Sequence, residues 1–224
     1  MEEFLGLPSL FIASLELLLL ANGLIFSQKN RVNLIVFIII GIFAANNIME
    51  FLICQFKINN KILLLTNFSL ISFLPPLSLL LVLKFWNHNT NLKFVIFLPT
   101  LVIVYYFINF IDSFKVTDCY YLYVTYLYPL RNELGIYYFL MNIAALAFLL
   151  VKLRKPKLRY KRHLNISLII ASTIAVIIPL LLLILFSSLH IYAESILNKF
   201  AFFYVLGLTY FSLKNKLEFL SEKG

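Results

Sequence analysis

Charged side chains are scarce in this sequence. Only 10 acidic and 19 basic residues occur among 224, and together they make up 13% of the chain, whereas 62% of the residues are hydrophobic. A water-soluble globule of this length needs more polar side chains than this to cover its surface. The scarcity excludes a soluble domain and predicts an integral membrane protein.

Sequence motifs of the common catalytic sites are also missing. The chain contains no GxSxG nucleophile elbow, no GxxxxGK[ST] phosphate-binding loop and no HExxH zinc motif. Cysteine occurs only twice and histidine only three times, which leaves few ligands for a transition metal. We therefore predict no catalytic residues, no metal site and no cofactor, and we expect that the protein is not an enzyme.

What the chain has in abundance is long apolar stretches. A helix needs about 20 apolar residues to cross a hydrocarbon core about 30 Å thick. Seven stretches of this kind, separated by polar or charged breaks, occur along the sequence. They predict an all-α membrane protein, with seven transmembrane helices in residues 1–213 and a short tail at 214–224. The stretches are Leu7–Phe26, Val32–Cys54, Ile62–Leu83, Phe94–Ile111, Leu134–Val151, Leu164–Leu189 and Phe200–Leu213.

Lysine and arginine are distributed unevenly between the two sides that these helices imply. The breaks on one side, together with the tail, hold 14 basic residues, and the breaks on the other side hold 5. Short loops rich in lysine and arginine stay in the cytoplasm. The amino terminus, which opens MEEF, is therefore expected outside and the carboxyl terminus inside. We expect the membrane to be a bacterial inner (cytoplasmic) membrane.

The break before the sixth stretch carries the densest basic cluster. Its lysines and arginines supply much of the net charge of +9. Membrane topology explains this charge, so nucleic-acid binding is not expected. Because each basic residue near an anionic leaflet adds about 1 kcal/mol of attraction, the cluster either sets topology alone or also holds anionic lipid headgroups. Its members are Lys152, Arg154, Lys155, Lys157, Arg159, Lys161 and Arg162.

Four of the polar side chains in the first three apolar stretches are candidates for a ligand site. Glu16 is expected near the middle of the membrane, and Asn46, Glu50 and Asn67 are expected in its outer half. Asn46 and Glu50 are four residues apart and share a helix face. A carboxylate facing lipid is costly, so such groups turn toward the bundle interior or a water-filled cavity. The four residues therefore predict either an outward-opening ligand pocket, floored by Glu16 and walled by the other three, or hydrogen bonds that only join helices.

Proline interrupts three of the expected helices. FLPPLSLLL places Pro75 and Pro76 in the third helix, FLPT places Pro99 in the fourth, and VIIPLLLL places Pro179 in the sixth. Each proline removes a backbone hydrogen bond and tends to kink its helix. Such a kink serves either as a hinge or as a fixed packing bend.

A longer polar and aromatic connection, residues 112–133, follows the fourth stretch. Its segment CYYLYVTYLYPL alternates tyrosines with aliphatic residues and is too short to span, which predicts a β-hairpin or an interfacial flap over the pocket mouth. This segment would act as a lid or as an aromatic belt. Cys54 and Cys119 both fall on the outer side, where oxidising conditions allow a disulfide between the loop and the second helix. Two free thiols are the alternative.

Several of these features occur together in one known arrangement. They are NNIMEF in the second helix, ISFLPPLSLLLVLKF in the third, the aromatic loop leading into LGIYYFL, and RYKRHLNISLII before the sixth. Over residues 5–215 this layout resembles the seven-helix amino-terminal sensor region of bacterial histidine kinases and diguanylate cyclases. Glu50, Pro75 and Pro76 occupy the family-like positions. The resemblance implies a membrane receptor that passes a conformational change to a cytoplasmic effector.

The end of the chain departs from that family. Its members usually continue into a transmitter domain, whereas only KNKLEFLSEKG follows the last helix here. We therefore expect a separate cytoplasmic signalling protein as a partner, besides the membrane lipids.

The sequence thus predicts a membrane-embedded sensor that binds a small or lipid-like ligand in the outer half of the helix bundle. A small transporter or channel subunit is the main alternative. FLPPLSLLLVLKF in the third helix and VIIPLLLLILF in the sixth are similar and run in opposite directions, as in an inverted repeat. A membrane enzyme that acts on lipid, with Glu16 or Glu50 as acid or base, is the third hypothesis.

Overall fold

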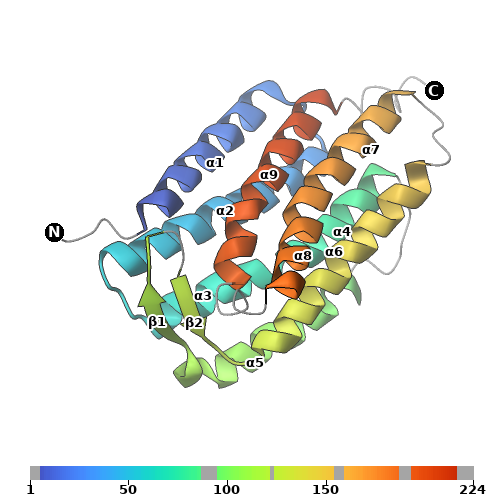
Figure 1. Cartoon of the computed structure of the whole chain (residues 1–224). Coiled ribbons are helices and arrows are strands. Elements are labelled where there is room, and N and C mark those ends of the chain that lie inside the picture. Colours follow the sequence, from blue (N-terminus) through green and yellow to red (C-terminus); the bar gives the residue numbers. More distant parts are fainter. Residues whose placement is uncertain (1–5, 87–94, 122–123, 154–158, 187–192, 216–224) are drawn as a thin grey trace.

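The computed structural model describes residues 6–86, 95–121, 124–153, 159–186 and 193–215 (Figure 1). In these ranges the chain is mostly helical, as the sequence predicts, with an antiparallel hairpin between α5 and α6. In chain order the elements are α1 (Leu7–Phe26), α2 (Arg31–Gln55), α3 (Lys61–Ser72), α4 (Leu74–Phe85), α5 (Leu98–Asn109), β1 (Lys115–Cys119), β2 (Val124–Leu127), α6 (Arg131–Leu153), α7 (Arg159–Ser172), α8 (Ile178–Leu185) and α9 (Ala193–Lys214). Short 3-10 turns over Val95–Phe97 and Ile111–Ser113 flank α5, and a π-helical turn over Thr173–Ile177 joins α7 to α8.

Six helical segments in the described ranges are long and apolar enough to cross a membrane. They are α1, α2, α6 and α9, the pair α3 and α4 taken together, and the run that contains α7 and α8. The fourth stretch, expected over Phe94–Ile111, forms only the shorter apolar helix Val95–Asn109. The fold is therefore that of an all-α membrane protein with six candidate spans. A seventh crossing and the orientation stay predictions.

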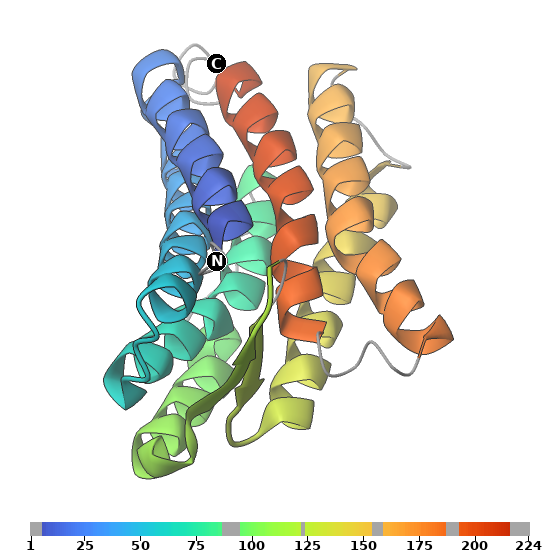
Figure 2. The same ribbon diagram turned by 60° about the vertical axis from the view of Figure 1, so that its left-hand side comes forward.

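The helices form one bundle with two distinct ends (Figures 1 and 2). We call the end at which β1 and β2 lie the hairpin end; α1, α6 and α9 begin there and α2 ends there. At the opposite end α1, α4, α6 and α9 end, and α2 and α7 begin. The start of α1 and the end of α9 thus lie at different ends of the bundle. The sequence places the hairpin end outside the cell.

Helix α2 is the centre of the bundle. Helices α1, α3, α4 and α9 all pack against it. Its sequence is apolar around most of its circumference, which is typical of a helix surrounded by others. Val36, Ile39 and Ile40 are fully buried, at 0% exposure. The helix begins at a conventional cap, because the Asn30 side chain accepts a hydrogen bond from the Asn33 backbone amide at 2.8 Å.

The hairpin packs on a cluster of aromatic rings. Tyr126 and Tyr128 turn inward, and their ring centroids lie 5.2 and 4.1 Å from that of Phe68 on α3. Phe107 of α5 and Phe114 belong to the same buried cluster. The tyrosine-rich segment therefore supplies the second strand of a β-hairpin, and this strand is part of the core. The first strand, Lys115–Cys119, ends where the tyrosines begin.

The prolines lie at helix starts, where a missing amide removes no hydrogen bond that the helix would make. Pro75 and Pro76 occupy the first turn of α4, directly after α3 ends, so the third span is interrupted there. Pro179 occupies the first turn of α8, after the π-helical turn, so the sixth span changes its helix type. Pro99 was expected inside the fourth helix, but it lies in the first turn of α5 and follows a 3-10 turn. It marks where that helix begins.

Helices α7 and α9 approach each other closely at Gly207. A Cβ atom at Gly207 would overlap with the Cβ of Ala171 on α7. Small residues at a crossing allow two helix backbones to come together in a membrane.

Candidate functional site

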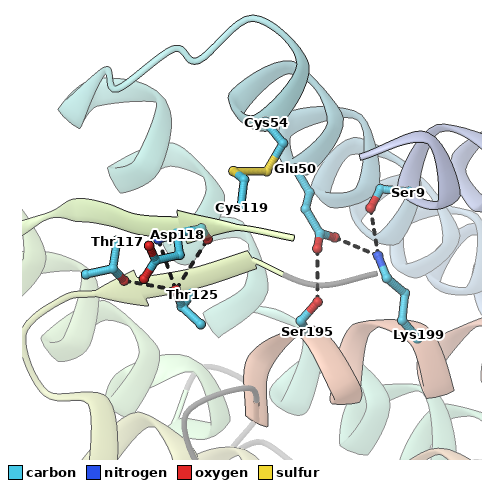
Figure 3. Close-up of a disulfide and its surroundings, with 9 residues drawn as sticks. All are labelled: Ser9, Glu50, Cys54, Thr117, Asp118, Cys119, Thr125, Ser195 and Lys199. Atoms are coloured by element: carbon cyan, nitrogen blue, oxygen red, sulfur yellow. Dashed lines mark hydrogen bonds and ion pairs between the residues drawn. A yellow bond between two sulfur atoms is a disulfide. The ribbon is translucent and has the colours of Figure 1, made fainter. Parts of the chain in front are cut away.

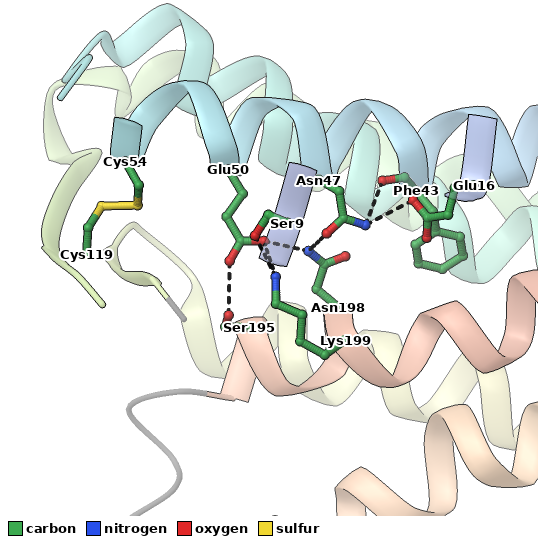
Figure 4. A network of polar contacts seen from close by, with 10 residues as sticks. All are labelled: Ser9, Glu16, Phe43, Asn47, Glu50, Cys54, Cys119, Ser195, Asn198 and Lys199. Atoms are coloured by element: carbon green, nitrogen blue, oxygen red, sulfur yellow. Dashed lines mark hydrogen bonds and ion pairs between the residues drawn. A yellow bond between two sulfur atoms is a disulfide. The ribbon is translucent and has the colours of Figure 1, made fainter. Parts of the chain in front are cut away.

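Polar side chains from α1, α2 and α9 form a continuous hydrogen-bonded network inside the bundle (Figure 4). Glu50 of α2 is buried, and its carboxylate accepts hydrogen bonds from three residues of α9. Oε1 accepts from Ser195 Oγ at 3.0 Å, and Oε2 accepts from Asn198 Nδ2 at 2.8 Å and from Lys199 Nζ at 3.0 Å. Lys199 Nζ also donates to Ser9 Oγ of α1 at 2.7 Å. Glu50 therefore joins α2 to α9, and Lys199 joins α9 to α1.

The network continues from Asn198 to Glu16. Asn198 Nδ2 also donates to Asn47 Oδ1 at 2.9 Å. Asn47 Nδ2 in turn donates to Glu16 Oε2 at 3.0 Å and to the Phe43 carbonyl at 3.3 Å. Carboxylate oxygens only accept hydrogen bonds, so the amide nitrogens of Asn47 and Asn198 must face Glu16 and Glu50. This assigns the orientation of both side-chain amides. Glu16 is fully buried, and its Oε1 has no partner within the described part of the chain.

Helical spacing explains how two helices meet so many partners. Ser195, Asn198 and Lys199 have the spacing i, i+3, i+4 and share one face of α9, and Asn47 and Glu50 share one face of α2. Buried polar groups that find partners add modest stability, whereas a buried group left alone costs about 1–3 kcal/mol. The network therefore fixes the pairing of α2 with α9.

A disulfide ties the hairpin to α2 beside this network (Figure 3). Cys54, near the end of α2, is bonded to Cys119, the last residue of β1, and their Cα atoms are 5.6 Å apart. Cys54 follows Glu50 by four residues, about one helical turn. Of the two states that the sequence left open, disulfide or free thiols, the structure has the disulfide.

A pocket of about 780 Å³ lies next to the network. Its walls come from α2, α3, α4, α6, α8 and α9, and from the turn between β2 and α6. Most of its lining is aromatic or aliphatic, including Phe43, Phe68, Leu74, Phe139 and Leu183. The hairpin covers part of it through Tyr128.

Polar side chains line one part of this pocket. Arg131 donates to Glu194 from Nε at 2.6 Å and from Nη2 at 2.8 Å, and Tyr128 Oη donates to Glu194 at 2.9 Å. Burial and the charge of Glu194 raise the pKa of Tyr128 well above its ordinary value, so its hydroxyl remains a donor at neutral pH. Asn46 and Asn198 also line the pocket. Oδ1 of Asn198 is buried and has no partner among the described residues.

The pocket opens sideways between α6 and α8. Ile136 and Leu140 of α6 and Ile184 of α8 line it, yet they are 61%, 62% and 66% exposed. Exposed aliphatic side chains on a membrane-spanning helix face the acyl chains of the bilayer. The exposed aliphatic side chains at this edge of the pocket therefore favour a mouth that faces the hydrocarbon region.

The structure separates the four residues that were expected to build one pocket. Asn46 lines the pocket. Glu16 and Glu50 do not line it, because polar groups of Asn47 and α9 enclose their carboxyl groups in the network. Asn67 of α3 is buried away from that lining, and its Oδ1 has no partner among the described residues. A pocket floored by Glu16 is thus not formed, and both carboxyl groups join helices instead.

Sequence reasoning missed the part that α9 contributes. It started the last helix at Phe200, which made Lys199 a loop charge, whereas α9 begins at Ala193. The signal is present in AESILNK, where Ser195 and Asn198 fall on the same helix face as Lys199.

The basic cluster is only partly described. At the opposite end of the bundle Lys152 lies in the last turn of α6, while Lys161 and Arg162 lie in the first turn of α7. Of Arg159 only the backbone is described, and Arg154, Lys155 and Lys157 lie outside the described residues.

Neither a cluster of metal ligands in the described ranges nor a similarity to a known protein points to a more specific function. No group of three or more His, Cys, Asp and Glu side chains within the described ranges is placed to hold a metal ion. No protein-family model matches the chain, and no curated protein and no solved structure matches it. A functional proposal therefore depends on the geometry of the pocket and the network.

Proposed function

We propose that this membrane protein is a receptor-like protein that binds a lipid-like ligand in the pocket near the hairpin. The observation that carries the proposal is the pocket itself, with a volume of about 780 Å³ and a mostly apolar lining. Ligand pockets commonly have volumes of about 300–1,000 Å³ and combine apolar walls with a few polar groups. A hydrocarbon chain with a small polar end has this chemistry.

The lateral mouth supports a ligand that arrives from the bilayer. A lipid entering between Ile136 and Ile184 keeps its chain in apolar surroundings throughout. Transfer of a hydrocarbon chain through water would expose each CH₂ group at a cost of about 0.8 kcal/mol.

The polar part of the pocket favours a ligand with an uncharged polar end. Arg131 and Glu194 carry opposite charges and bind each other through two hydrogen bonds, so together they add no net charge. A charged headgroup would have to break this pair or enter without a partner, which is costly away from water. Asn198 Oδ1, in contrast, would gain a donor from a ligand hydroxyl or amide. Hydroxyl-bearing lipids such as monoacylglycerols or fatty alcohols belong to this class.

Helix α9 provides a route from the pocket to the opposite end of the bundle. Glu194 and Asn198 near its start line the pocket, and Lys214 at its other end lies where the sequence places the cytoplasm. A ligand that binds one arrangement of α9 better than another shifts the population toward that arrangement. The receptor would signal in this way to a separate cytoplasmic protein. A spin label on a Lys214→Cys variant tests this step, and a spectrum unchanged by ligand contradicts it.

A photoreactive lipid tests the binding proposal. We expect a monoacylglycerol with a diazirine in its acyl chain to label the parts of α6 and α8 that line the pocket, and unlabelled monoacylglycerol to compete. A fatty acid of the same chain length, which is charged at neutral pH, should compete at least about tenfold less well, because the described cation of the pocket, Arg131, is already bonded to Glu194. Labelling spread evenly over the lipid-facing helix surfaces contradicts the proposal.

A transporter is the second candidate, and one observation favours it. The third and sixth spans, which carry the similar proline sequences, are both interrupted near their prolines. Transporters often form their substrate sites from such discontinuous helices. Flux of a labelled monoacylglycerol between leaflets of reconstituted vesicles separates this candidate from a receptor, which binds without moving the ligand.

A further inference from the structure

The charges of the described structure are segregated along the bundle. The described carboxylates are Glu16 and Glu50 in the network, Asp112 and Asp118 beside and in the hairpin, and Glu133 and Glu194 in the first turns of α6 and α9. No described carboxylate lies at the opposite end, where α4 and α6 end and α7 begins. Several basic side chains lie at that end, and for two of them, Lys152 and Lys161, no described residue supplies an acidic partner.

Two of these basic side chains meet at one aromatic corner. The Lys152 ammonium lies 5.8 Å from the centroid of the Trp86 ring, and the Lys161 ammonium lies 5.7 Å from the same ring. Lys152 also lies 5.2 Å from the Phe148 ring centroid, and Lys161 lies 5.9 Å from that of Phe85. A ring face attracts a cation less strongly than a full counter-charge does. The two ammonium groups thus share one tryptophan ring, and no carboxylate among the described residues lies at this end.

Hydrogen bonds hold the corner in place across three helices. Trp86, directly after α4, donates from Nε1 to Asn165 Oδ1 of α7 at 3.3 Å. Asn165 Nδ2 donates to the Leu149 carbonyl of α6 at 2.8 Å. The positions of α4, α6 and α7 around the indole are therefore coupled, and the site exists before a ligand binds.

Apolar surface continues from the two lysines into the membrane. Leu150 and Val151, directly before Lys152 on α6, are 47% and 65% exposed. A molecule with its anionic group at the lysines can therefore lay an acyl chain against α6. A free anion in the cytoplasm would use only the lysines.

We propose that Lys152, Lys161 and Trp86 form a binding site for the phosphate headgroup of an anionic phospholipid from the adjoining leaflet. The phosphate oxygens accept from the two ammonium groups, the indole packs against the headgroup region, and an acyl chain covers Leu150 and Val151. This site lies at the end of the bundle opposite the pocket, and it does not depend on the proposed receptor function.

Trp86 makes the site directly measurable, because it is the single tryptophan of the protein. Bromine atoms on acyl chains quench tryptophan fluorescence only at close range. The protein is reconstituted into phosphatidylcholine vesicles that contain brominated phosphatidylglycerol or, at the same mole fraction, brominated phosphatidylcholine. We expect brominated phosphatidylglycerol to quench Trp86 more strongly than brominated phosphatidylcholine. Because two lysines contact the headgroup, the apparent affinity for the anionic lipid should be at least about tenfold higher. Equal quenching by both lipids overturns the proposal.

Matched variants separate this site from general attraction to an anionic surface. Lys152→Gln with Lys161→Gln should abolish the preference for phosphatidylglycerol, and Lys152→Arg with Lys161→Arg should keep it. Lys57→Gln with Lys115→Gln removes the same charge near the hairpin and should also keep it. A preference lost equally in both glutamine pairs overturns the proposal. Excess inorganic phosphate should not displace the lipid; displacement at millimolar phosphate would assign the site to a free anion and overturn the lipid assignment.

Discussion

The Lys199 ammonium lies 3.0 Å from Glu50 Oε2 in the interior of the bundle, with the two side chains 22% and 4% exposed. The Lys61 ammonium lies closer to its partner Asp112, at 2.6 Å, but those side chains are 48% and 88% exposed. Exposed pairs contribute little because water and salt screen them, whereas removal of one member of a buried pair leaves the other charge without a partner. Burial therefore decides which of these ion pairs stabilises the fold.

Replacement of Lys199 by methionine should destabilise the protein strongly. Glu50 would keep its hydrogen bonds from Ser195 and Asn198 but would lose its counter-charge, at a cost of about 3 kcal/mol or more. Thermal unfolding in detergent measures the change. Lys61→Met is the matched control and should shift the unfolding free energy much less, because water and salt screen its pair with Asp112. Equal shifts in both variants would contradict the network.

The neighbouring asparagines Asn46 and Asn47 should respond differently to replacement by leucine. Asn47 bonds to Glu16, Asn198 and the Phe43 carbonyl, so Asn47→Leu should lower the unfolding free energy by about 2 kcal/mol or more. Asn46 has no hydrogen-bond partner within the described ranges and lines the pocket. Asn46→Leu should therefore change stability little and weaken ligand binding. The reverse pattern in paired stability and binding assays would show that the two roles are misassigned.

The contact between α7 and α9 predicts a suppressible defect. Gly207→Ala places a methyl group against Ala171, and overpacking of this kind costs about 1–3 kcal/mol. The second change Ala171→Gly makes room and should restore most of the loss. Gly41→Ala, where a Cβ would meet no atom within 4 Å, is the control and should be neutral or stabilising. The unfolding free energies of Gly207→Ala, Ala171→Gly, the double variant and Gly41→Ala test this contact. If the double variant loses the sum of the two single losses, the residues are not in direct contact.

Reduction should loosen the hairpin. The disulfide closes a loop with a sequence separation of 65 residues, and cross-links over loops of this size stabilise proteins by up to about 4 kcal/mol. Reductant should therefore lower the unfolding temperature of the wild type. The double variant Cys54→Ala with Cys119→Ala should already unfold at the lower temperature and should not respond. Two titratable thiols in the unreduced wild-type protein would rule out the disulfide.

The helices and the hairpin were predictable because their signals are local. Apolar runs bounded by polar breaks such as SQKNR give α1 and the start of α2, and the alternation of tyrosines with aliphatic residues gives the second strand. The fourth span stays a prediction, because the described helix there, Val95–Asn109, is shorter than the other candidate spans. The start of α9 was placed too late because polar residues in AESILNK look like a loop when their partners are unknown.

The candidate site was less predictable because it depends on contacts between distant residues. Glu50 and Asn198, which share a hydrogen bond, are 148 positions apart. Helical periodicity shows that Asn46 and Glu50 share a face, but it does not show which neighbouring helix meets that face. The choice between Asn46 in the pocket and Asn47 in the network depends on a rotation of about 100° along α2.

The most direct test of the receptor proposal is native mass spectrometry of the protein released from its own membrane in mild detergent. The pocket predicts a bound amphipathic molecule with an uncharged polar end. Its occupancy should fall at least about tenfold in Leu183→Trp, which fills the pocket, and should persist in Leu185→Trp, which places the same indole on the exposed face of α8. Equal occupancy in both variants, or no bound lipid in the wild type, would contradict the proposal.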